Sequence, residues 1–390
     1  MIPYGKQDIS DEDIESVIKV LKSDYLTQGP MVPEFEYIVS EYCKVKYAIA
    51  VNSATSALHI SCLALGVGKG DIVWTSPITF VASANCALYC GASVEFVDID
   101  SQTYNISINA LTKKLENAEK QGILPKVIIP VHLSGQSCEM KHIHELSKRY
   151  GFKIIEDASH AIGGKYLNEP IGNCTYSDIT VFSFHPVKVI TSGEGGMAVT
   201  NDNQLATDLV RLRSHGIVRH PSEMTKMPDG PWHYQQIELG FNYRMTDIHA
   251  ALGISQMKRI DEFIEKRHAI SERYDTLLKD ASIIIPYQHP DSYSGSHLYI
   301  IRVKNNIKRE TRLQLFERLR SSGILVNLHY IPVYKHPYYE KIGYKSEEFP
   351  EAEAYYSEAI SLPLYFSLTN EQQDLIVNII KKQGGFQNLF

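Results

Sequence analysis

Short apolar runs alternate with longer segments of helical spacing over the first 200 residues. The apolar runs are bounded by polar residues and glycines, and they predict strands at 47–51, 72–76, 94–97, 127–131, 153–156 and 179–184. Segments between them, such as 32–42 and 140–150, have the periodicity of helices. Strands and helices that alternate in this way predict an α/β fold, with a mostly parallel central sheet flanked by helices.

The second half of the chain has a different pattern. A long helical pattern from about Thr246 to Leu278 predicts one helix that bridges two domains, and 297–303, 309–322 and 324–328 predict a strand, a helix and a strand. We therefore expect a large domain at 1–250 and a smaller α+β domain at 251–390, which includes the bridging helix. The first residues, about 12 of them, are expected to pack on the small domain.

Composition and charge exclude several function classes. The 390 residues carry a net charge of −6 and no basic stripe, so nucleic acid is not an expected partner. No apolar run reaches the length of a membrane helix, and the first residues lack the apolar core of a signal peptide, so we expect a cytoplasmic protein. The six cysteines are scattered and complete no zinc pattern, so no metal is expected.

One lysine stands out because it lies in a loop between two predicted strands. The segment 183–188 reads Ser-Phe-His-Pro-Val-Lys, and Thr-Ser-Gly-Glu-Gly-Gly follows at 191–196. A lysine held in this way can be desolvated, which lowers its pKa and frees an amine for a Schiff base. Asp157, at the end of another strand, could pair with a pyridinium nitrogen. Lys188 and Asp157 are thus the two groups that pyridoxal phosphate needs most, although a solvated lysine and a helix N-cap are the ordinary alternatives.

Other polar residues follow predicted strands and could reach the same place. Thr55 and Ser56 lie at the start of a helix, where amides and hydroxyls favour a phosphate, and Ser183 could add a third hydroxyl. Simple N-capping is the alternative. Phe80 could stack on a pyridine ring or belong to the core. His160 could hydrogen-bond the cofactor's phenolate oxygen or be a satisfied histidine beside the site. Asn242 could reach a neighbouring subunit's phosphate or lie in a surface turn.

Six segments together resemble one known family. They are 26–29 (Leu-Thr-Gln-Gly), 52–58 (Asn-Ser-Ala-Thr-Ser-Ala-Leu), 156–161 (Glu-Asp-Ala-Ser-His-Ala), 183–188, 240–245 (Gly-Phe-Asn-Tyr-Arg-Met) and 329–332 (His-Tyr-Ile-Pro). In this order they resemble the DegT/DnrJ/EryC1/StrS sugar aminotransferases, which are fold-type-I pyridoxal-phosphate enzymes. The resemblance spans nearly the whole chain.

The resemblance implies a role for each matching residue. Lys188 would carry the cofactor as a Schiff base, and Asp157 would pair with its ring nitrogen. The cofactor-binding set would be Ala54, Thr55, Phe80, Asp157, His160, Ser183, Lys188 and the partner subunit's Asn242. The nucleotide sugar would contact Tyr4, Asp24, Tyr25, Leu26, Thr27, Asn327, Leu328, His329 and Tyr330.

Within the family, the chain most resembles the aminotransferases of pseudaminic acid biosynthesis, in which a histidine replaces the glutamine that many members carry at position 160. This implies transfer of an amino group from glutamate to C4 of a UDP-linked 4-keto-6-deoxy-N-acetylhexosamine, of the UDP-4-keto-L-AltNAc type. The product would be UDP-4-amino-4,6-dideoxy-N-acetyl-β-L-altrosamine. It also implies a homodimer whose active sites are completed across the interface.

Several alternatives stay open. The substrate could be another nucleotide 4-keto or 3-keto sugar, as in bacillosamine, legionaminic acid or deoxysugar pathways. A sugar dehydratase of the same fold would replace Lys188 with histidine. A nicotinamide-dependent oxidoreductase would need a Gly-x-Gly-x-x-Gly segment after the first strand, which is absent. A cofactor-binding regulator would need a helix-turn-helix segment or a basic extension, and the sequence has neither.

Overall fold

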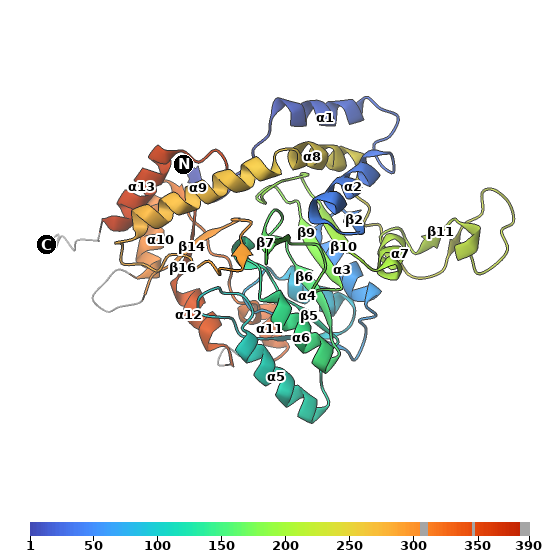
Figure 1. Ribbon diagram of the computed structural model, residues 1–390, viewed down its shortest axis with the longest axis horizontal. Coiled ribbons are helices and arrows are strands. Elements are labelled where there is room, and N and C mark those ends of the chain that lie inside the picture. The colour runs from blue at the N-terminus through green and yellow to red at the C-terminus, as the bar shows by residue number, and fades with distance from the viewer. Residues whose placement is uncertain (305–310, 345–347, 383–390) are drawn as a thin grey trace.

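The computed structural model describes residues 1–304, 311–344 and 348–382, and a seven-stranded sheet lies at its centre (Figure 1). The strands are β2 (Tyr47–Val51), β3 (Ile72–Thr75), β4 (Ser93–Phe96), β5 (Val127–Ile129), β6 (Lys153–Asp157), β9 (Ile179–Ser183) and β10 (Gly196–Thr200). They are ordered β2-β10-β9-β6-β5-β3-β4, and only the pairs that include β10 are antiparallel. The predicted α/β fold with a mostly parallel sheet is confirmed.

Helices cover both faces of this sheet because successive strand residues point to opposite faces. Ile155 and Val181 belong to a core with α3 and α4, whereas their neighbours Ile154 and Phe182 pack on the other face. The helices of this part of the chain are α2 (Met31–Cys43), α3 (Ala54–Ala64), α4 (Ala82–Tyr89), α5 (Ile108–Gln121), α6 (Met140–Tyr150), α7 (Asn203–Leu212) and α8 (Asp247–Met257). Both faces of the strands are therefore apolar, as in other buried parallel sheets.

A second hydrophobic core is built mainly from the C-terminal part of the chain. Its elements are α9 (Ile260–Leu278), β14 (Tyr299–Arg302), α10 (Arg312–Ser321), β15 (Ile324–Leu325), β16 (Ala359–Leu362) and α13 (Asn370–Lys381). The N-terminal strand β1 (Ile2–Pro3) joins this core by pairing in parallel with β15. This pairing carries the first residues across the molecule, and the N-terminus lies beside α13 (Figure 1).

The predicted single helix at 246–278 is wrong, because the structure has two helices there. Between α8 and α9, the amides of Lys258 and Arg259 bond three residues back, to Ser255 and Gln256, which ends α8. The Arg259 side chain turns away to bond Asp8, at 2.8 Å. The helix thus ends in a local turn within a pattern that the sequence alone presents as continuous.

Other predicted elements differ at their ends. The strand expected at 324–328 is shortened to β15, and the helix expected at 309–322 is α10, whose predicted first residues, 309 and 310, lie outside the described residues. The other α-helices and strands are α1 (Asp11–Leu21), α11 (Pro337–Lys341), α12 (Pro350–Glu358), β7 (Lys165–Tyr166), β8 (Glu169–Pro170), β11 (Ile217–Val218), β12 (Gln235–Gln236) and β13 (Ser292–Tyr293). Among the described helices, none is both long and apolar enough to cross a membrane.

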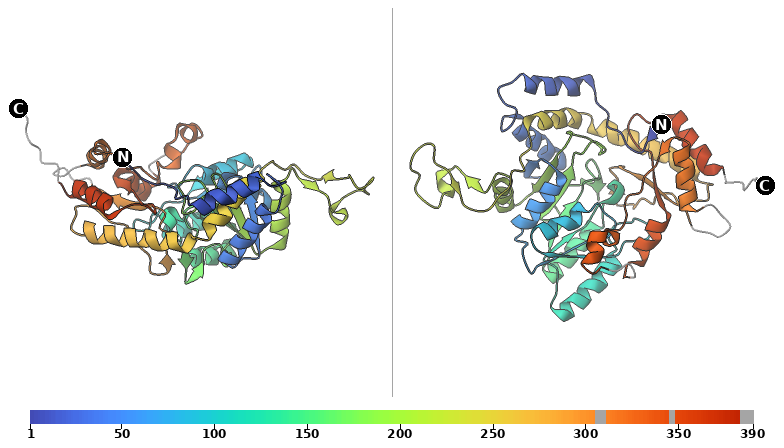
Figure 2. Two further views of the ribbon diagram at one scale, coloured as in Figure 1. Left: turned by 90° about the horizontal axis from the view of Figure 1, so that it is seen from above. Right: turned by 180° about the vertical axis from the view of Figure 1, so that it is seen from behind.

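A hairpin projects from the body of the molecule. It comprises residues 217–239, which we call the arm, and its two strands β11 and β12 pair in antiparallel. The arm extends beyond α7 at one end of the molecule, and the views from above and behind agree (Figures 1 and 2). Several of its large apolar side chains are exposed, among them Trp232 (74% accessible) and Leu239 (77% accessible).

Candidate active site

The predicted site residues gather at the carboxyl edge of the sheet. β2 and β9 are both antiparallel to β10, so they run in the same direction as each other and as the parallel strands β3, β5 and β6. Their carboxyl ends therefore lie along one edge, where open α/β sheets bind ligands. Asp157 ends β6 and Ser183 ends β9, and the two strands are neighbours.

Lys188 lies in a loop that backbone hydrogen bonds hold in place. Its own amide donates to the carbonyl of His185, at 2.9 Å, and the two ends of the loop meet where the Phe184 amide donates to Gly195, also at 2.9 Å. The side chain is half-buried. Burial lowers the pKa of Lys188 to about 8, and the negative charge of Asp157 opposes that shift. A sizeable fraction of this amine is therefore neutral near pH 7.5.

Asp157 is buried and held by two donors. The Ser83 hydroxyl donates to Oδ2 at 2.6 Å, and the Ser159 amide donates to Oδ1 at 3.1 Å. Ser83 comes from α4 and is itself 2.7 Å from the hydroxyl of Thr79. The carboxylate is thus fixed in orientation and keeps lone pairs for a further donor.

Three buried histidines surround this pair and carry no charge. Burial is the main cause that holds the pKa of His160 and His297 well below the usual range, and the positive charge of Lys188 adds to it. Burial likewise lowers the pKa of His329 to about 3. The rings of His160 and His297 have centroids 4.4 Å apart. The site therefore offers neutral hydrogen-bonding groups around one amine and one carboxylate.

The N-terminal strand and the segment after β15 bring aromatic residues to the same place. The rings of Tyr4 and His329 have centroids 5.0 Å apart, and His160 Nε2 lies 3.0 Å from the hydroxyl of Tyr330. Asn327 exchanges backbone hydrogen bonds with Ser361, and the Leu328 amide donates to the side chain of Asn327. The structure thus gathers Tyr4, His329, Tyr330 and His160, and the charge of Lys188 acts on the two histidines. Asn327 and Leu328 mainly anchor the segment.

The start of α3 follows the carboxyl end of β2 and lies at the same edge of the sheet. Ser53 caps the helix by accepting from the amide of Ser56, so the cap is Ser53 and not Thr55. Among the hydrogen bonds of the described residues, none uses the Thr55 hydroxyl. Gly196 lies directly beneath, because a Cβ there would lie 2.4 Å from the carbonyl carbon of Ser53 and 2.5 Å from the Ala54 amide nitrogen. A glycine is required for this close approach.

Three of the predicted contacts lie apart or face solvent. Phe80 is 58% exposed, so it is not a core residue, and its ring centroid is 6.2 Å from that of Tyr330. Asn242 is exposed, and its backbone forms an isolated antiparallel β-bridge with Ser214. The loop Asp24, Tyr25, Leu26 and Thr27 is exposed throughout and is tied to the start of α8.

The sequence did not point to three contributors. Ser83 lies inside an apolar helix, Ser134 donates its amide to His160 Nδ1 at 3.3 Å, and His297 precedes β14. A serine in a helix or a loop carries no periodic signal that would single it out. The roles of these residues become visible only from the side chains that they contact in the folded structure.

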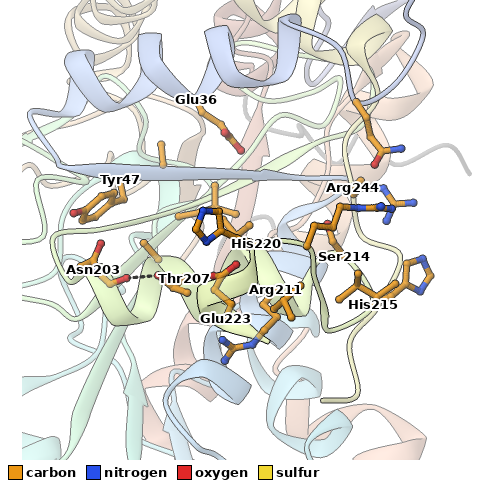
Figure 3. A pocket seen from close by; sticks show the side chains of 18 of the residues that line it. Glu36, Tyr47, Asn203, Thr207, Arg211, Ser214, His215, His220, Glu223 and Arg244 are labelled. Carbon is orange, nitrogen blue, oxygen red and sulfur yellow. Dashed lines mark hydrogen bonds between the residues drawn. The ribbon is translucent and has the colours of Figure 1, made fainter. Parts of the chain in front are cut away.

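A pocket of about 990 Å³ lies elsewhere, between α2, β2 and α7 (Figure 3). It is lined at one end by Arg244 and His215 and contains both acidic and basic side chains, among them Glu36, Glu223 and Arg211. None of the residues predicted to bind cofactor or substrate lines it. The base of the arm forms part of its wall.

Comparison with known proteins identifies the family. The model of the DegT/DnrJ/EryC1/StrS aminotransferase family matches residues 7–381. The chain is 38% identical to the UDP-4-amino-4,6-dideoxy-N-acetyl-β-L-altrosamine transaminase of Campylobacter jejuni serotype O:23/36, over 98% of both chains. It superimposes on Helicobacter pylori PseC, an aminotransferase involved in the biosynthesis of pseudoaminic acid, with a TM-score of 0.87, 31% identity and coverage of 97% of this chain and 98% of that one.

Spr1654 of Streptococcus pneumoniae, solved in its PMP form, gives a TM-score of 0.88 at 30% identity and 98% coverage of both chains. These matches cover nearly the full length of each protein. The chain belongs to the DegT/DnrJ/EryC1/StrS aminotransferase family.

Proposed function

We propose that the chain is a pyridoxal-phosphate-dependent aminotransferase that moves an amino group from glutamate to C4 of a UDP-linked 4-keto-6-deoxy-N-acetylhexosamine. The observation that carries this proposal is the half-buried Lys188, whose pKa is lowered to about 8 by burial and which lies within the field of Asp157. Such an amine can form an imine with an aldehyde near neutral pH.

The residues at the sheet edge fit this cofactor. Asp157 offers a fixed anionic acceptor for a ring nitrogen, and the backbone amides and the Thr55 hydroxyl at the start of α3, a turn that packs closely against Gly196, suit a phosphate. Ser183, buried at the end of β9, would add a hydroxyl, and the exposed ring of Phe80 would cover one face of the cofactor. When bound, pyridoxal phosphate supplies an aldehyde and a ring that accepts an electron pair.

Lys188 would then move the proton. Its Nζ, released when the amino donor takes its place, would remove the donor's α-proton and later deliver a proton to C4 of the sugar. Asp157 would hold the proton on the ring nitrogen throughout, because an anion favours a protonated partner. The face of the sugar that Lys188 Nζ reaches would set the configuration of the new amine.

The sugar assignment is supported by two relatives. The Campylobacter jejuni protein, 38% identical, is named for the altrosamine product, and Helicobacter pylori PseC has the same fold. In this chain, Tyr4 packs against His329, and Tyr330 bonds His160, so these residues would present hydroxyl and imidazole groups to a sugar bound near Lys188. Glutamate is proposed as the donor because the family resemblance implies it.

We further propose a homodimer formed through the face that carries the arm. The arm exposes the large apolar side chains of Trp232 and Leu239. Several exposed apolar side chains on one segment are typical of a protein–protein interface. The pocket at its base, the exposed Asn242 and the loop Asp24–Thr27, whose neighbour Gln28 lines that pocket, lie on connected elements. A second copy that covers this face would bring the partner subunit's Asn242 toward a site.

The test is product analysis with a panel of sugars. Wild-type protein with pyridoxal phosphate and glutamate is incubated with epimeric UDP-4-keto-6-deoxy-N-acetylhexosamines, and NMR identifies the C4 amine and its configuration. We expect the altrosamine product and its loss in Lys188→Ala, whereas Lys258→Ala, on the exposed break between α8 and α9, keeps it. Normal turnover by Lys188→Ala would refute the mechanism, and amination of only a different epimer would refute the sugar.

Asp157→Asn separates binding from turnover. The amide can occupy the same place and accept from Ser83, so cofactor binding should persist, but a neutral partner does not hold the ring proton. We expect turnover to fall at least about 100-fold with little change in bound cofactor. Turnover like that of wild type would contradict the role of Asp157.

Sedimentation of wild type and of a Trp232→Ser, Leu239→Ser variant tests the dimer, which the double change should weaken.

A further inference from the structure

One buried side-chain amide joins three segments that are far apart in the sequence. It belongs to Gln256, in α8. Its Oε1 accepts from the backbone amide of Thr191, at 3.4 Å, in the loop 184–195 that carries Lys188, which we call the lysine loop. Its Nε2 donates to the backbone carbonyl of Asp8, at 2.8 Å, and to Asp13 Oδ2, at 2.6 Å. Gln256 therefore connects the lysine loop with the first residues of the chain.

The partners fix the orientation of this amide. A backbone N–H can only donate, so the oxygen of Gln256 faces Thr191. The carbonyl of Asp8 and the carboxylate of Asp13 accept, so the nitrogen of Gln256 faces both of them. The reverse orientation would set the oxygen against two acceptors and the nitrogen against a donor. A carboxamide at this position thus makes three bonds that neither an apolar side chain nor a carboxylate could make together.

Thr191 transmits this contact to the rest of the lysine loop. Its hydroxyl donates to the carbonyl of Phe184, at 3.0 Å, and accepts from the amide of Gly193, at 2.9 Å. Phe184 is the residue at which the two ends of the loop meet, and both Phe184 and Thr191 are buried. A shift of Thr191 would therefore move the backbone from which Lys188 projects.

The first residues of the chain approach the same loop a second time. A Cβ at Gly5 would lie 3.8 Å from the Cβ of Val187, so Gly5 lies beside the lysine loop. The carbonyl of the preceding residue, Tyr4, accepts from the amide of Leu364, at 3.0 Å, which ties it to the C-terminal core. After Asp8 the chain continues into α1, which lies alongside α8 (Figure 1). The segment 2–13 is thus anchored at both ends and passes the lysine loop between its anchors.

We propose that Gln256 is a positioning residue for the reaction at Lys188. Its carboxamide fixes the lysine loop against the segment 2–13, which carries Tyr4, and so holds the Lys188 amine in place while it moves the proton. This inference rests on the proposed function, because it requires Lys188 to be the base. Displacing a reacting group by about 1 Å can cost on the order of 100-fold in rate. Loss of the link should therefore slow proton transfer more than it weakens cofactor binding, which is proposed to depend on α3 and Asp157.

The experiment follows one half of the reaction in full-length protein loaded with pyridoxal phosphate. Saturating glutamate is added, and the loss of the visible absorbance band is recorded in a single turnover. Gln256→Met keeps the length of the side chain but makes none of the three bonds. We expect its rate to fall at least about tenfold, while its affinity for pyridoxal phosphate stays within about threefold of wild type.

Gln373→Met is the matched control. Gln373 is also a buried glutamine in a helix, α13, and its Nε2 donates to the backbone carbonyl of Ile270, at 2.9 Å. Its replacement removes a buried amide bond of the same kind in the C-terminal core, so it should lower the midpoint of urea unfolding but keep the wild-type rate with glutamate. The pair of variants separates a loss of stability from a loss of positioning.

Asp13 tests the link from its other end. Asp13→Ala removes one acceptor of the Gln256 amide, so it should slow the glutamate reaction. The double variant with Gln256→Met should be no slower than Gln256→Met alone, because both changes break one link. Asp13→Asn should keep the wild-type rate, since its amide oxygen can accept from Gln256 and from the Ser10 amide as Oδ2 does. Its nitrogen would replace Oδ1, which accepts no hydrogen bond within the described parts of the chain.

The outcomes separate this inference from the function on which it rests. If Gln256→Met reacts with glutamate at the rate of Gln373→Met, or loses cofactor affinity instead of rate, the inference is overturned while the proposed function stands. If Gln256→Met does not fold, an unchanged rate in Asp13→Ala overturns the inference in its place. If wild-type protein forms no absorbance band that Lys188→Ala abolishes, or glutamate does not discharge that band, the proposed function fails, and this inference fails with it.

Discussion

Gly196→Ala should damage the site through one added methyl group. Gly196 begins β10, pairs with Ser183 and Val51, and lies against the turn that starts α3. The added Cβ would lie 2.4 Å from the carbonyl carbon of Ser53, so reaching an ordinary contact of 3.4 Å needs a displacement of about 1 Å. The atoms it meets belong to the backbone, and both elements are held by the sheet or by a capped helix.

The cost has two parts. Overpacking a buried position typically costs about 1–3 kcal/mol of unfolding free energy. A displacement of about 1 Å at the start of α3 also moves the amides proposed to hold the phosphate, and such misplacements can cost on the order of 100-fold in rate. We therefore expect the affinity for pyridoxal phosphate to fall at least about tenfold, together with a lower midpoint of urea unfolding.

Gly68→Ala is the matched control. A Cβ at Gly68 meets nothing within 4 Å, so its urea midpoint and cofactor affinity should equal those of wild type. Cofactor affinity is measured by equilibrium titration of the visible absorbance, and stability is measured on protein without cofactor. If Gly196→Ala binds cofactor as tightly as Gly68→Ala, the start of α3 does not hold the phosphate, or the strand yields more easily than its pairing implies.

Two further predictions concern the buried polar groups. Burial lowers the pKa of Lys188 to about 8. The rate at which apoprotein recombines with pyridoxal phosphate should therefore rise as pH increases through about 8 and level off above it. A flat rate between pH 7 and 9 would contradict that pKa. Glu156→Ala should lower the free energy of urea unfolding by about 3–5 kcal/mol, since it leaves buried His132 and the hydroxyls of Ser177 and Thr180 without their acceptor. A loss below about 1 kcal/mol would show that water replaces the carboxylate.

The sequence predicts the sheet well because its strands are buried on both faces. The run at 47–51 and the helix at 140–150 match the structure residue for residue, since apolar content and length decide them. The proximity of Asp157 to Lys188 follows from the same pattern, because residues at the ends of parallel strands share one edge. These are consequences of local composition combined with one rule of topology.

Contacts between distant segments could not be predicted in this way. Nothing near Arg259 signals a helix break, and one partner of its side chain, Asp8, lies 251 residues away. Likewise Ser83 becomes a partner of Asp157 only when the fold brings α4 to the end of β6. The local sequence around Ser83 or Arg259 would look the same whether or not such a distant partner existed.

The low charge of the site explains why one lysine can act as a base there. Burial alone would drive the pKa of Lys188 down, and Asp157 limits the fall to about 8. Burial is the main cause that lowers the pKa of His160, His297 and His329, and the positive charge of Lys188 adds to it, so these imidazoles stay neutral. A cation on any of them would lower the proton affinity of Lys188 further, whereas a second carboxylate would raise it. The site therefore combines one amine and one carboxylate with neutral hydrogen-bonding groups, so that the amine can gain and lose a proton close to neutral pH.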